Sequence, residues 1–355
     1  MSIGESSMAF NQGVTFFLIS IAGSLMYRQL RKTIRTSKLF SGSVRSFTNT
    51  SGKGDSETEY KETLQNLFRA VKSTSRHRPT DPQQGNANLA AAKITKTNED
   101  LFAERQKFFS KLALDSQMIR DQTRVIHIAG SKGKGSVVEY LSTALRSNNK
   151  KVGIFTSPHL HTARERIKIN REMISKEDLT RIGKANLASM FNFNWTVFFD
   201  LFLASAIQYF GEQAVDYVIL ETGIGGRYDS TNFVQKVDIG VITSISYDHT
   251  QVLGETLTLI AWQKAGIIKR GMHVFTPSTQ AAEALVVIQQ QCKDMQAHLH
   301  VVDITDSELK KALGNEEVKI FDVQVENACV ALAVAKHMQL TPSSKKKMLQ
   351  EYANM

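Results

Sequence analysis

A run of glycines and lysines follows a short apolar segment, and its residue types suit phosphate binding. Residues 124–129 have the composition of a buried strand, and 136–147 that of a helix. Glycine lets the backbone fold closely around phosphate oxygens with its N–H groups pointing inward. The N-terminus of the helix adds partial positive charge. The predicted phosphate contacts are Gly130, Ser131, Lys132, Gly133, Lys134, Gly135 and Ser136.

Within this loop, Lys134 has the length to reach the outer phosphates, and the Ser136 hydroxyl could serve phosphate or magnesium. The order of residues departs from the GxxxxGK[ST] pattern, because Lys134 precedes Gly135 and Ser136 stands where lysine is expected. The alternative is a flexible turn rich in glycine and lysine. The flanking strand and helix favour a variant phosphate loop.

Three acidic or histidine positions are further candidates for chemistry. Glu221 ends the apolar segment 216–221, and ligand sites of α/β sheets form at the carboxyl ends of strands. His249 follows Asp248 after another apolar segment, although a lone histidine is more often structural. Asp200 lies in a predicted helix, where it could touch substrate or be an ordinary acid on a polar face.

These residues lie within an alternation of strands and helices. The predicted strands are 124–129, 152–156, 216–221, 237–245, 273–276 and 298–302. The predicted helices are 136–147, 176–188, 196–209, 256–269 and 280–296, preceded by two further helices at 57–73 and 99–112. Such an alternation predicts an α/β fold, a mostly parallel sheet with helices on both faces.

Composition narrows the class of protein. The 355 residues include only two cysteines, Cys292 and Cys329, which predicts neither a disulfide framework nor a metal cluster and favours a reducing compartment. The net charge is +10, but residues 1–54 supply +6 of it. Because no basic domain or RNA-binding signature remains, we expect no nucleic-acid partner.

Residues 1–54 have the composition of a targeting segment. They are rich in Arg and Ser and contain a single acid, Glu5, as transit peptides do. The apolar stretch 16–23 is short for a membrane span, which needs about 20 residues. A mitochondrial presequence is the favoured interpretation, with an additional cytosolic form, a plastid or anchoring signal, or a disordered tail as alternatives.

Five segments together carry a family resemblance. They are the loop 130–136, 155–170 with Ser157-Pro158-His159, 221–232 with Glu221-Thr222-Gly223, 248–256, and 260–269 with Lys264-Ala265-Gly266. In order and spacing they resemble the folylpolyglutamate and dihydrofolate synthase family of the Mur ligase superfamily, over about 130–271 and more weakly to about 336. The resemblance implies a Mur-ligase-type central ATPase domain with a phosphate loop.

The resemblance also implies a reaction and its participants. ATP phosphorylates a folate carboxylate to an acyl phosphate, which the amine of L-glutamate attacks. Tetrahydrofolate is the expected acceptor, with dihydropteroate as the alternative. The implied Mg²⁺ ligands are Ser157, Glu221 and His249. Lys264 could bind a second magnesium if carbamylated, or be an ordinary lysine on a helix surface; with Lys134 and His249 it completes the expected catalytic set.

Further residues follow from the same resemblance. Asp200, Tyr228, Asp229 and Ser230 are expected near the substrate, and Asp229, Thr231 and Asn232 are expected to shape the turn beside the pterin. Gln324 and Asn327 resemble a segment that approaches ATP. Val323 stands where the family usually has histidine, which weakens that part of the expected nucleotide contact.

The expected organisation has four parts. They are a targeting segment at 1–54, a helical region at 55–122, an ATP-binding domain at 123–340, and the start of a further region at 341–355. The family has a C-terminal domain beyond this point, so we expect little or no ligase activity from the chain alone. An inactive nucleotide-binding fragment is therefore the third functional alternative. We expect a monomer without a stable membrane span.

Overall fold

The computed structural model describes residues 56–74, 98–111, 120–190, 198–305, 307, 309, 312 and 322–353. The predicted targeting segment lies outside these residues. A compact unit extends from Gly54 to Met355. Among the helices described, none has the length and apolar character to cross a membrane.

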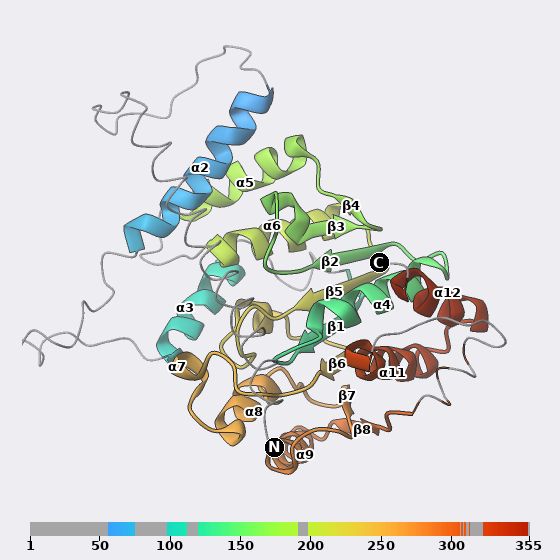
Figure 1. The fold of residues 1–355 in the computed structure, drawn as a ribbon. Helices are drawn as coiled ribbons and strands as arrows, with labels where there is room; N and C mark the ends of the chain where they lie inside the picture. The colour runs from blue at the N-terminus through green and yellow to red at the C-terminus, as the bar shows by residue number, and fades with distance from the viewer. Residues whose placement is uncertain are drawn as a thin grey trace, which may run out of the picture. The chain divides into compact units, whose positions relative to one another are not determined.

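An eight-stranded sheet forms the centre of this unit, in the order β4-β3-β2-β5-β1-β6-β7-β8 (Figure 1). The strands are β1 (Arg124–Ala129), β2 (Val152–Phe155), β3 (Ile167–Ile169), β4 (Glu172–Met173), β5 (Tyr217–Glu221), β6 (Ile239–Ile242), β7 (His273–Pro277) and β8 (His298–Val302). The six strands from β2 to β8 in this order are parallel to their neighbours, which confirms the predicted mostly parallel sheet.

Two strand predictions need correction. The antiparallel strands β3 and β4 extend the sheet beyond β2, and the sequence analysis missed them because they have only three and two residues. The strand predicted over 237–245 ends at Ile242. Beyond it, the backbone leaves the sheet and contacts the phosphate loop, since Ser244 accepts a hydrogen bond from the Ser131 N–H at 2.9 Å.

Helices occupy the positions expected between the strands. They are α2 (Ser56–Thr74), α3 (Asn98–Lys111), α4 (Lys134–Arg146), α5 (Lys176–Met190), α6 (Phe198–Glu212), α7 (Thr250–Leu253), α8 (Leu257–Ala265), α9 (Ala282–Asp294), α11 (Asp322–His337) and α12 (Pro342–Ala353). Two 3₁₀ turns, η3 (Ala163–Arg166) and η4 (Ser230–Phe233), complete the described elements. The helix predicted from Ser136 begins two residues earlier, at Lys134.

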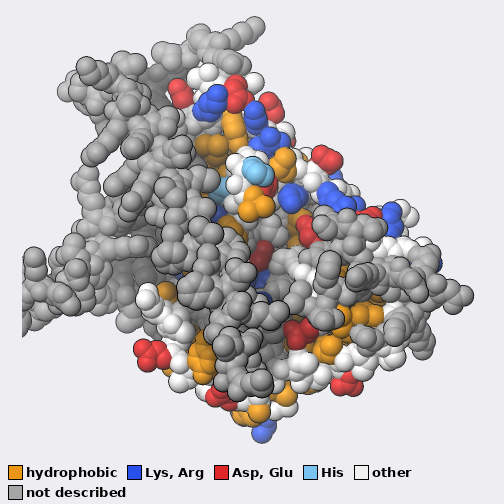
Figure 2. All heavy atoms as spheres, in the orientation of Figure 1, with side chains coloured by type: hydrophobic (Ala, Val, Ile, Leu, Met, Phe, Trp, Pro, Cys, Tyr) orange, Lys and Arg blue, Asp and Glu red, His pale blue; other side chains and the backbone are white. Residues whose placement is uncertain are grey.

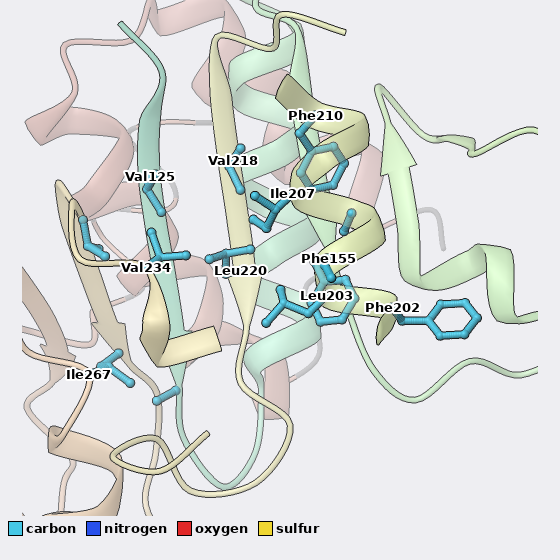
Figure 3. Close-up of a cluster of buried hydrophobic side chains, with 14 of the residues drawn as sticks. Val125, Phe155, Phe202, Leu203, Ile207, Phe210, Val218, Leu220, Val234 and Ile267 are labelled. Atoms are coloured by element: carbon cyan, nitrogen blue, oxygen red, sulfur yellow. The ribbon is translucent and has the colours of Figure 1, made fainter. Parts of the chain in front are cut away.

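The alternating side chains of the strands build one apolar layer on each face of the sheet. Val125 and Val218 belong to the layer that includes Ile207 of α6, and Figure 3 shows these residues between β1, β5 and α6. Ile126 and Ile128 belong to the opposite layer, which α4, α11 and α12 cover. Both faces of the sheet are therefore buried, as in other parallel sheets with crossover helices.

The regions upstream and downstream of the predicted ATP-binding domain pack onto it. Helix α2 lies against α5, α3 lies against η4, and α12 lies against α4. Oppositely charged side chains accompany the first of these contacts, as in the 2.5 Å ion pair of Lys176 with Glu57. On the face seen in Figure 2, basic and acidic side chains of the described residues are interspersed.

Candidate nucleotide and metal site

The predicted phosphate loop lies between β1 and α4, and the segment after β6 holds it. The Thr243 hydroxyl donates to the Lys132 carbonyl at 2.6 Å. Gly130 has φ 151°, and a Cβ atom there would lie 1.8 Å from the Thr243 hydroxyl oxygen. Gly133 adopts a left-handed conformation with φ 83°. These two positions therefore require glycine for the loop to keep its shape.

Ser131 is already engaged within the protein. Its hydroxyl donates to the Ser246 carbonyl at 2.9 Å and accepts from the Ser246 N–H at 3.0 Å. Its backbone N–H donates to the Ser244 carbonyl. Ser131 thus ties the phosphate loop to the segment 243–249, and its predicted direct contact with phosphate stays a prediction.

Two lysines converge on the loop. The ammonium groups of Lys264 and Lys134 donate to the Gly130 carbonyl at 2.8 Å and 3.2 Å. Lys264 is only 2% exposed, so the alternative of a surface lysine is wrong. Burial, followed by the positive charge of Lys134, lowers the pKa of Lys264 to about 8. The two ammonium groups place positive charge beside Gly130, where it would stabilise an anion.

Glu221 faces this loop from the end of β5. One carboxylate oxygen accepts the Ser157 N–H at 3.1 Å, and a Cβ atom on Gly135 would lie 4.0 Å from the other. The carboxylate is 5% exposed, and burial raises its pKa, against the opposing effect of Lys134. The structure therefore brings Glu221, Ser157 and the phosphate loop together.

His249 occupies a different environment from Glu221. It precedes α7 with φ 49°, and its Nε2 lies 3.6 Å from the Asp248 carboxylate. Nearly half of its side chain is exposed, at 48%. Its segment is joined to the phosphate loop through the contact of Ser131 with Ser246. The assignment of His249 as a magnesium ligand remains a prediction.

Asp200 and Ser230 are partners within the core. The Ser230 hydroxyl donates to one oxygen of the fully buried Asp200 carboxylate, and the Arg105 Nε lies 3.6 Å from the other oxygen. Arg105 also donates to the Tyr228 carbonyl at 2.8 Å. Asp200 therefore links α6, η4 and α3, and the alternative that placed it on a solvated helix face is wrong. Tyr228 keeps a half-buried ring 6.1 Å from that of Trp262.

Asp229 organises the glycine-rich turn after β5. Its carboxylate accepts four hydrogen bonds: the N–H groups of Gly223 and Ile224 at 3.0 Å and 3.1 Å, and the N–H and hydroxyl of Thr231 at 3.0 Å and 2.5 Å. Burial raises its pKa, which these bonds oppose. Asn232 joins the same turn to α8 by donating to the Gly266 carbonyl at 3.1 Å. These contacts hold the turn against the elements that carry Glu221 and Lys264.

His127 extends this network into β1. Its Nε2 lies 2.8 Å from the Thr231 hydroxyl oxygen. Because that hydroxyl donates to Asp229, His127 must donate through Nε2, and its Nδ1 has no hydrogen-bond partner among the described residues. Burial, with a smaller effect of Lys269, lowers the pKa of His127 to about 3. The imidazole is therefore a neutral structural donor.

Arg166 is a candidate that the sequence analysis did not assign to the site. It ends η3, is 9% exposed, and donates from Nε to the His159 Nδ1 at 2.8 Å. Burial lowers its pKa, and the charge of Glu221 opposes this effect. A nearly buried guanidinium close enough to interact with Glu221 suits an anionic ligand. In the sequence, the signal for Arg166 was its position in the segment 155–170, which carries part of the family resemblance.

Of the two amides predicted near ATP, Asn327 lies beside the loop, and Gln324 is its hydrogen-bond partner. Asn327 of α11 donates to the Gln324 side-chain oxygen at 3.2 Å. A Cβ atom on Gly133 would lie 2.0 Å from the Asn327 side-chain oxygen. The side chain of Val323 lies outside the described residues.

The fold and this loop define the class of protein. The chain belongs to the Mur ligase family, since the Mur ligase middle domain matches residues 128–335. This match confirms the superfamily expected from the five segments.

Particular relatives narrow the resemblance. The mitochondrial folylpolyglutamate synthase of Bos taurus is 36% identical over 235 residues, which are 61% of this chain and 38% of the relative. The dihydrofolate synthase/folylpolyglutamate synthase of Bacillus subtilis is 42% identical over 176 residues, 48% of this chain and 40% of the relative. The chain thus spans about two fifths of the length of the curated relatives it matches.

A solved structure agrees with these relatives. The folylpolyglutamate synthase of Thermotoga maritima superposes with a TM-score of 0.64 and 26% identity, over 83% of this chain and 66% of its own. The resemblance to folylpolyglutamate synthases is therefore confirmed by sequence and by fold.

Proposed function

We propose that the chain carries the ATP-binding domain of a ligase that joins L-glutamate to tetrahydrofolate through an acyl phosphate. The observation that carries the proposal is the convergence of Lys134 and Lys264 on Gly130, opposite the buried carboxylate of Glu221. A site with two cations and one carboxylate suits a polyphosphate that binds together with a divalent metal. The folate and glutamate substrates are proposed from the relatives, which are folylpolyglutamate synthases.

The residues present fit a magnesium ion. Glu221 is a buried carboxylate beside the loop, and it accepts a hydrogen bond from the Ser157 N–H. The hydroxyl of the same serine offers a second oxygen ligand. Oxygen ligands of this kind suit Mg²⁺, and His249 would add a less usual nitrogen ligand. The ion would neutralise phosphate charge during transfer. A carbamylated Lys264 would add a second carboxylate-like ligand, and its lowered pKa of about 8 favours the neutral amine that this modification needs.

The other side chains have positioning roles in this proposal. The loop glycines hold the backbone around the phosphates, and Lys134 neutralises the transferred phosphoryl group. Tyr228, which has a half-buried ring beside the Asp229 turn, lies on the side proposed for folate. Arg166 is suited to hold an anionic group near Glu221, either a substrate carboxylate or a phosphate.

The first test is ATP-dependent incorporation of labelled glutamate into tetrahydrofolate by the full chain with Mg²⁺. Incorporation that Lys134→Ala abolishes would support the proposal. The Bacillus subtilis relative bears both activity names, so dihydropteroate should be assayed in parallel. Incorporation into dihydropteroate alone would favour the second candidate function. Binding of ATP and Mg²⁺ without incorporation by the chain alone, but with incorporation once the C-terminal domain of a relative is added, would also support the proposal. No incorporation in either case would favour an inactive nucleotide-binding fragment.

The proposed location is the mitochondrion. Its support is the Arg- and Ser-rich composition of residues 1–54, together with the mitochondrial names of relatives. Import of the full chain into isolated mitochondria, with and without residues 1–54, would test it. Equal import of the two forms would contradict the proposal.

A further inference from the structure

Four of the nine histidines lie together on β7, β8 and α11, away from the phosphate loop. His273 begins β7, His298 begins β8, His300 follows on the same strand, and His337 ends α11. The phosphate loop follows the carboxyl end of β1, which is parallel to β7 and β8 within the sheet. His273 and His298 therefore lie at the amino ends of the parallel strands, whereas the candidate nucleotide site lies at their carboxyl ends.

The register of the sheet places three of these side chains on one face. His273 pairs with His298, and Phe275 pairs with His300. Side chains two residues apart point to the same face of a strand. That face is the one covered by α11, because Phe275 belongs to the same apolar layer as the buried residues of α11. The last residue of α11, His337, meets the histidines of β7 and β8 there.

Three imidazoles are close enough to share one ion. The Nδ1 of His273 lies 3.0 Å from the Nε2 of His300, and one ligand nitrogen from each of His273, His300 and His337 lies within 4.8 Å of the others. Two nitrogens bound tetrahedrally to Zn²⁺ at 2.0–2.1 Å lie about 3.4 Å apart. The hydrogen bond between His273 and His300 therefore holds these two nitrogens near the separation of a zinc site, and an ion would replace the proton that they share. The ligand nitrogen of His337 would move closer on binding.

The surroundings favour the form of imidazole that binds metals. The ring of His300 stacks on Phe275 at 4.4 Å, and the rings of His273 and His337 lie 4.1 Å apart. Burial lowers the pKa of His273 and of His300, and the neighbouring histidines add to this effect. The two imidazoles are therefore neutral near pH 7, and a neutral ring nitrogen is what a metal requires.

We propose that His273, His300 and His337 form a zinc site with an open fourth position for water. An all-imidazole set suits Zn²⁺ among the borderline metals, and it does not suit Mg²⁺, which prefers oxygen. The fourth histidine, His298, stacks on His273 at 4.8 Å and supports its ring without belonging to the ligand set. The site is separate from the one that contains Glu221 and Ser157.

The position of the site gives the metal a structural effect. It would join the end of α11 to β7 and β8, and Asn327 near the other end of α11 contacts the phosphate loop at Gly133. An ion that binds the folded state alone stabilises it by mass action. Zinc should therefore raise the melting temperature of the protein, and a chelator should reverse the increase.

The test uses the full chain without a polyhistidine tag, with excess Mg²⁺ to occupy the oxygen site. Zinc affinity is measured by calorimetry, and Co²⁺ is substituted to read coordination from its visible absorption. The variants are His273→Ala, His300→Ala and His337→Ala. Matched controls are His298→Ala in the cluster, His161→Ala on the exposed segment after β2, and His249→Ala at the candidate magnesium site.

We expect one zinc ion per chain, a four-coordinate Co²⁺ spectrum, and at least about tenfold weaker binding in each of the three ligand variants. The controls should keep the affinity of the unmodified protein. Because His337 is exposed, His337→Ala should fold even where a strand variant does not. Absence of zinc binding, or binding lost only in His249→Ala, would overturn the proposal. Loss in His298→Ala equal to that in His300→Ala would overturn the three-ligand assignment.

Discussion

Lys134 of α4 and Lys264 of α8 donate to the same acceptor, the carbonyl oxygen of Gly130, at 3.2 Å and 2.8 Å. Two ammonium groups that share one neutral acceptor repel each other, and this repulsion adds to the burial that lowers the pKa of Lys264. A bound anion would relieve the repulsion. The arrangement therefore keeps positive charge in place at a cost to the stability of the folded state, as expected of a binding site rather than of a structural contact.

The first prediction concerns the pH dependence of stability. Folding lowers the pKa of Lys264 from 10.5 to about 8, so between these values the unfolded chain holds a proton that the folded chain has released. The free energy of unfolding should therefore rise with pH across this window. In the unmodified protein this rise amounts to about 3 kcal/mol between pH 7.5 and pH 10.5. Lys264→Met lacks the titrating amine and should not show the rise, so its stability relative to the unmodified protein should fall across the same range.

Urea denaturation at the two pH values measures this difference. Other groups that titrate cancel when the variant and the unmodified protein are compared at each pH. Lys150→Met, at an exposed position, is the matched control. A constant difference between Lys264→Met and the unmodified protein would show that Lys264 is not held as a desolvated amine.

The second prediction concerns the modification of Lys264. The neutral amine attacks carbon dioxide, a nitrogen–carbon bond forms, and the nitrogen releases one proton to water. With ¹³C-labelled bicarbonate, the unmodified protein should show a carbamate carbon signal that Lys264→Met lacks. The same signal in Lys264→Met would place the modification elsewhere in the chain.

The third prediction separates two glycines of the loop. A Cβ atom on Gly133 would lie 2.0 Å from the Asn327 side chain in a left-handed conformation, so Gly133→Ala should destabilise the fold by about 1–3 kcal/mol. A Cβ atom on Gly135 would meet only the Glu221 carboxylate, at 4.0 Å. Gly135→Ala should therefore leave stability nearly unchanged and weaken the binding of ATP with Mg²⁺. Equal losses of stability in the two variants would refute the distinction.

The fourth prediction concerns Glu221. Glu221→Gln keeps an oxygen that can accept the Ser157 N–H but removes the charge, so Mg²⁺-dependent ATP binding should fall by at least about tenfold. Since burial raises the pKa of Glu221, protonation should compete with Mg²⁺ at a higher pH than for an exposed carboxylate. Magnesium affinity should thus decrease as pH is lowered in the unmodified protein but not in Glu221→Gln. The exposed Glu172→Gln is the control for calorimetry.

The sequence was sufficient for the parallel sheet because the pattern of apolar strands and helices is local. The positions of Glu221 and the phosphate loop at strand ends followed from the same pattern, and the structure brings them together. The hairpin of β3 and β4 could not be predicted, since strands of three and two residues carry no measurable period.

The roles of individual polar residues were harder to predict, because they depend on tertiary partners. Ser131 and Asp200 have side chains suited to ligands, yet Ser246 and Arg105 engage them, from positions far away in the sequence. The zinc cluster depends on the same kind of contact, since the register of β7 and β8 and the end of α11 bring it together. No spacing of histidines along the chain indicates it.

The fifth prediction tests Asp200, which was expected near the substrate. Its carboxylate is fully buried between the Ser230 hydroxyl and Arg105. Asp200→Ala would leave the Arg105 guanidinium without this carboxylate, which lowers the free energy of unfolding. Because the Arg105 side chain is 22% exposed, water partly compensates, and the expected loss is about 2–3 kcal/mol. Asp200→Asn keeps an acceptor for Ser230 and should lose less. Denaturation and folate titration of both variants distinguish a structural role from a substrate contact. Unchanged stability of Asp200→Ala together with weakened folate binding would instead place Asp200 in contact with substrate.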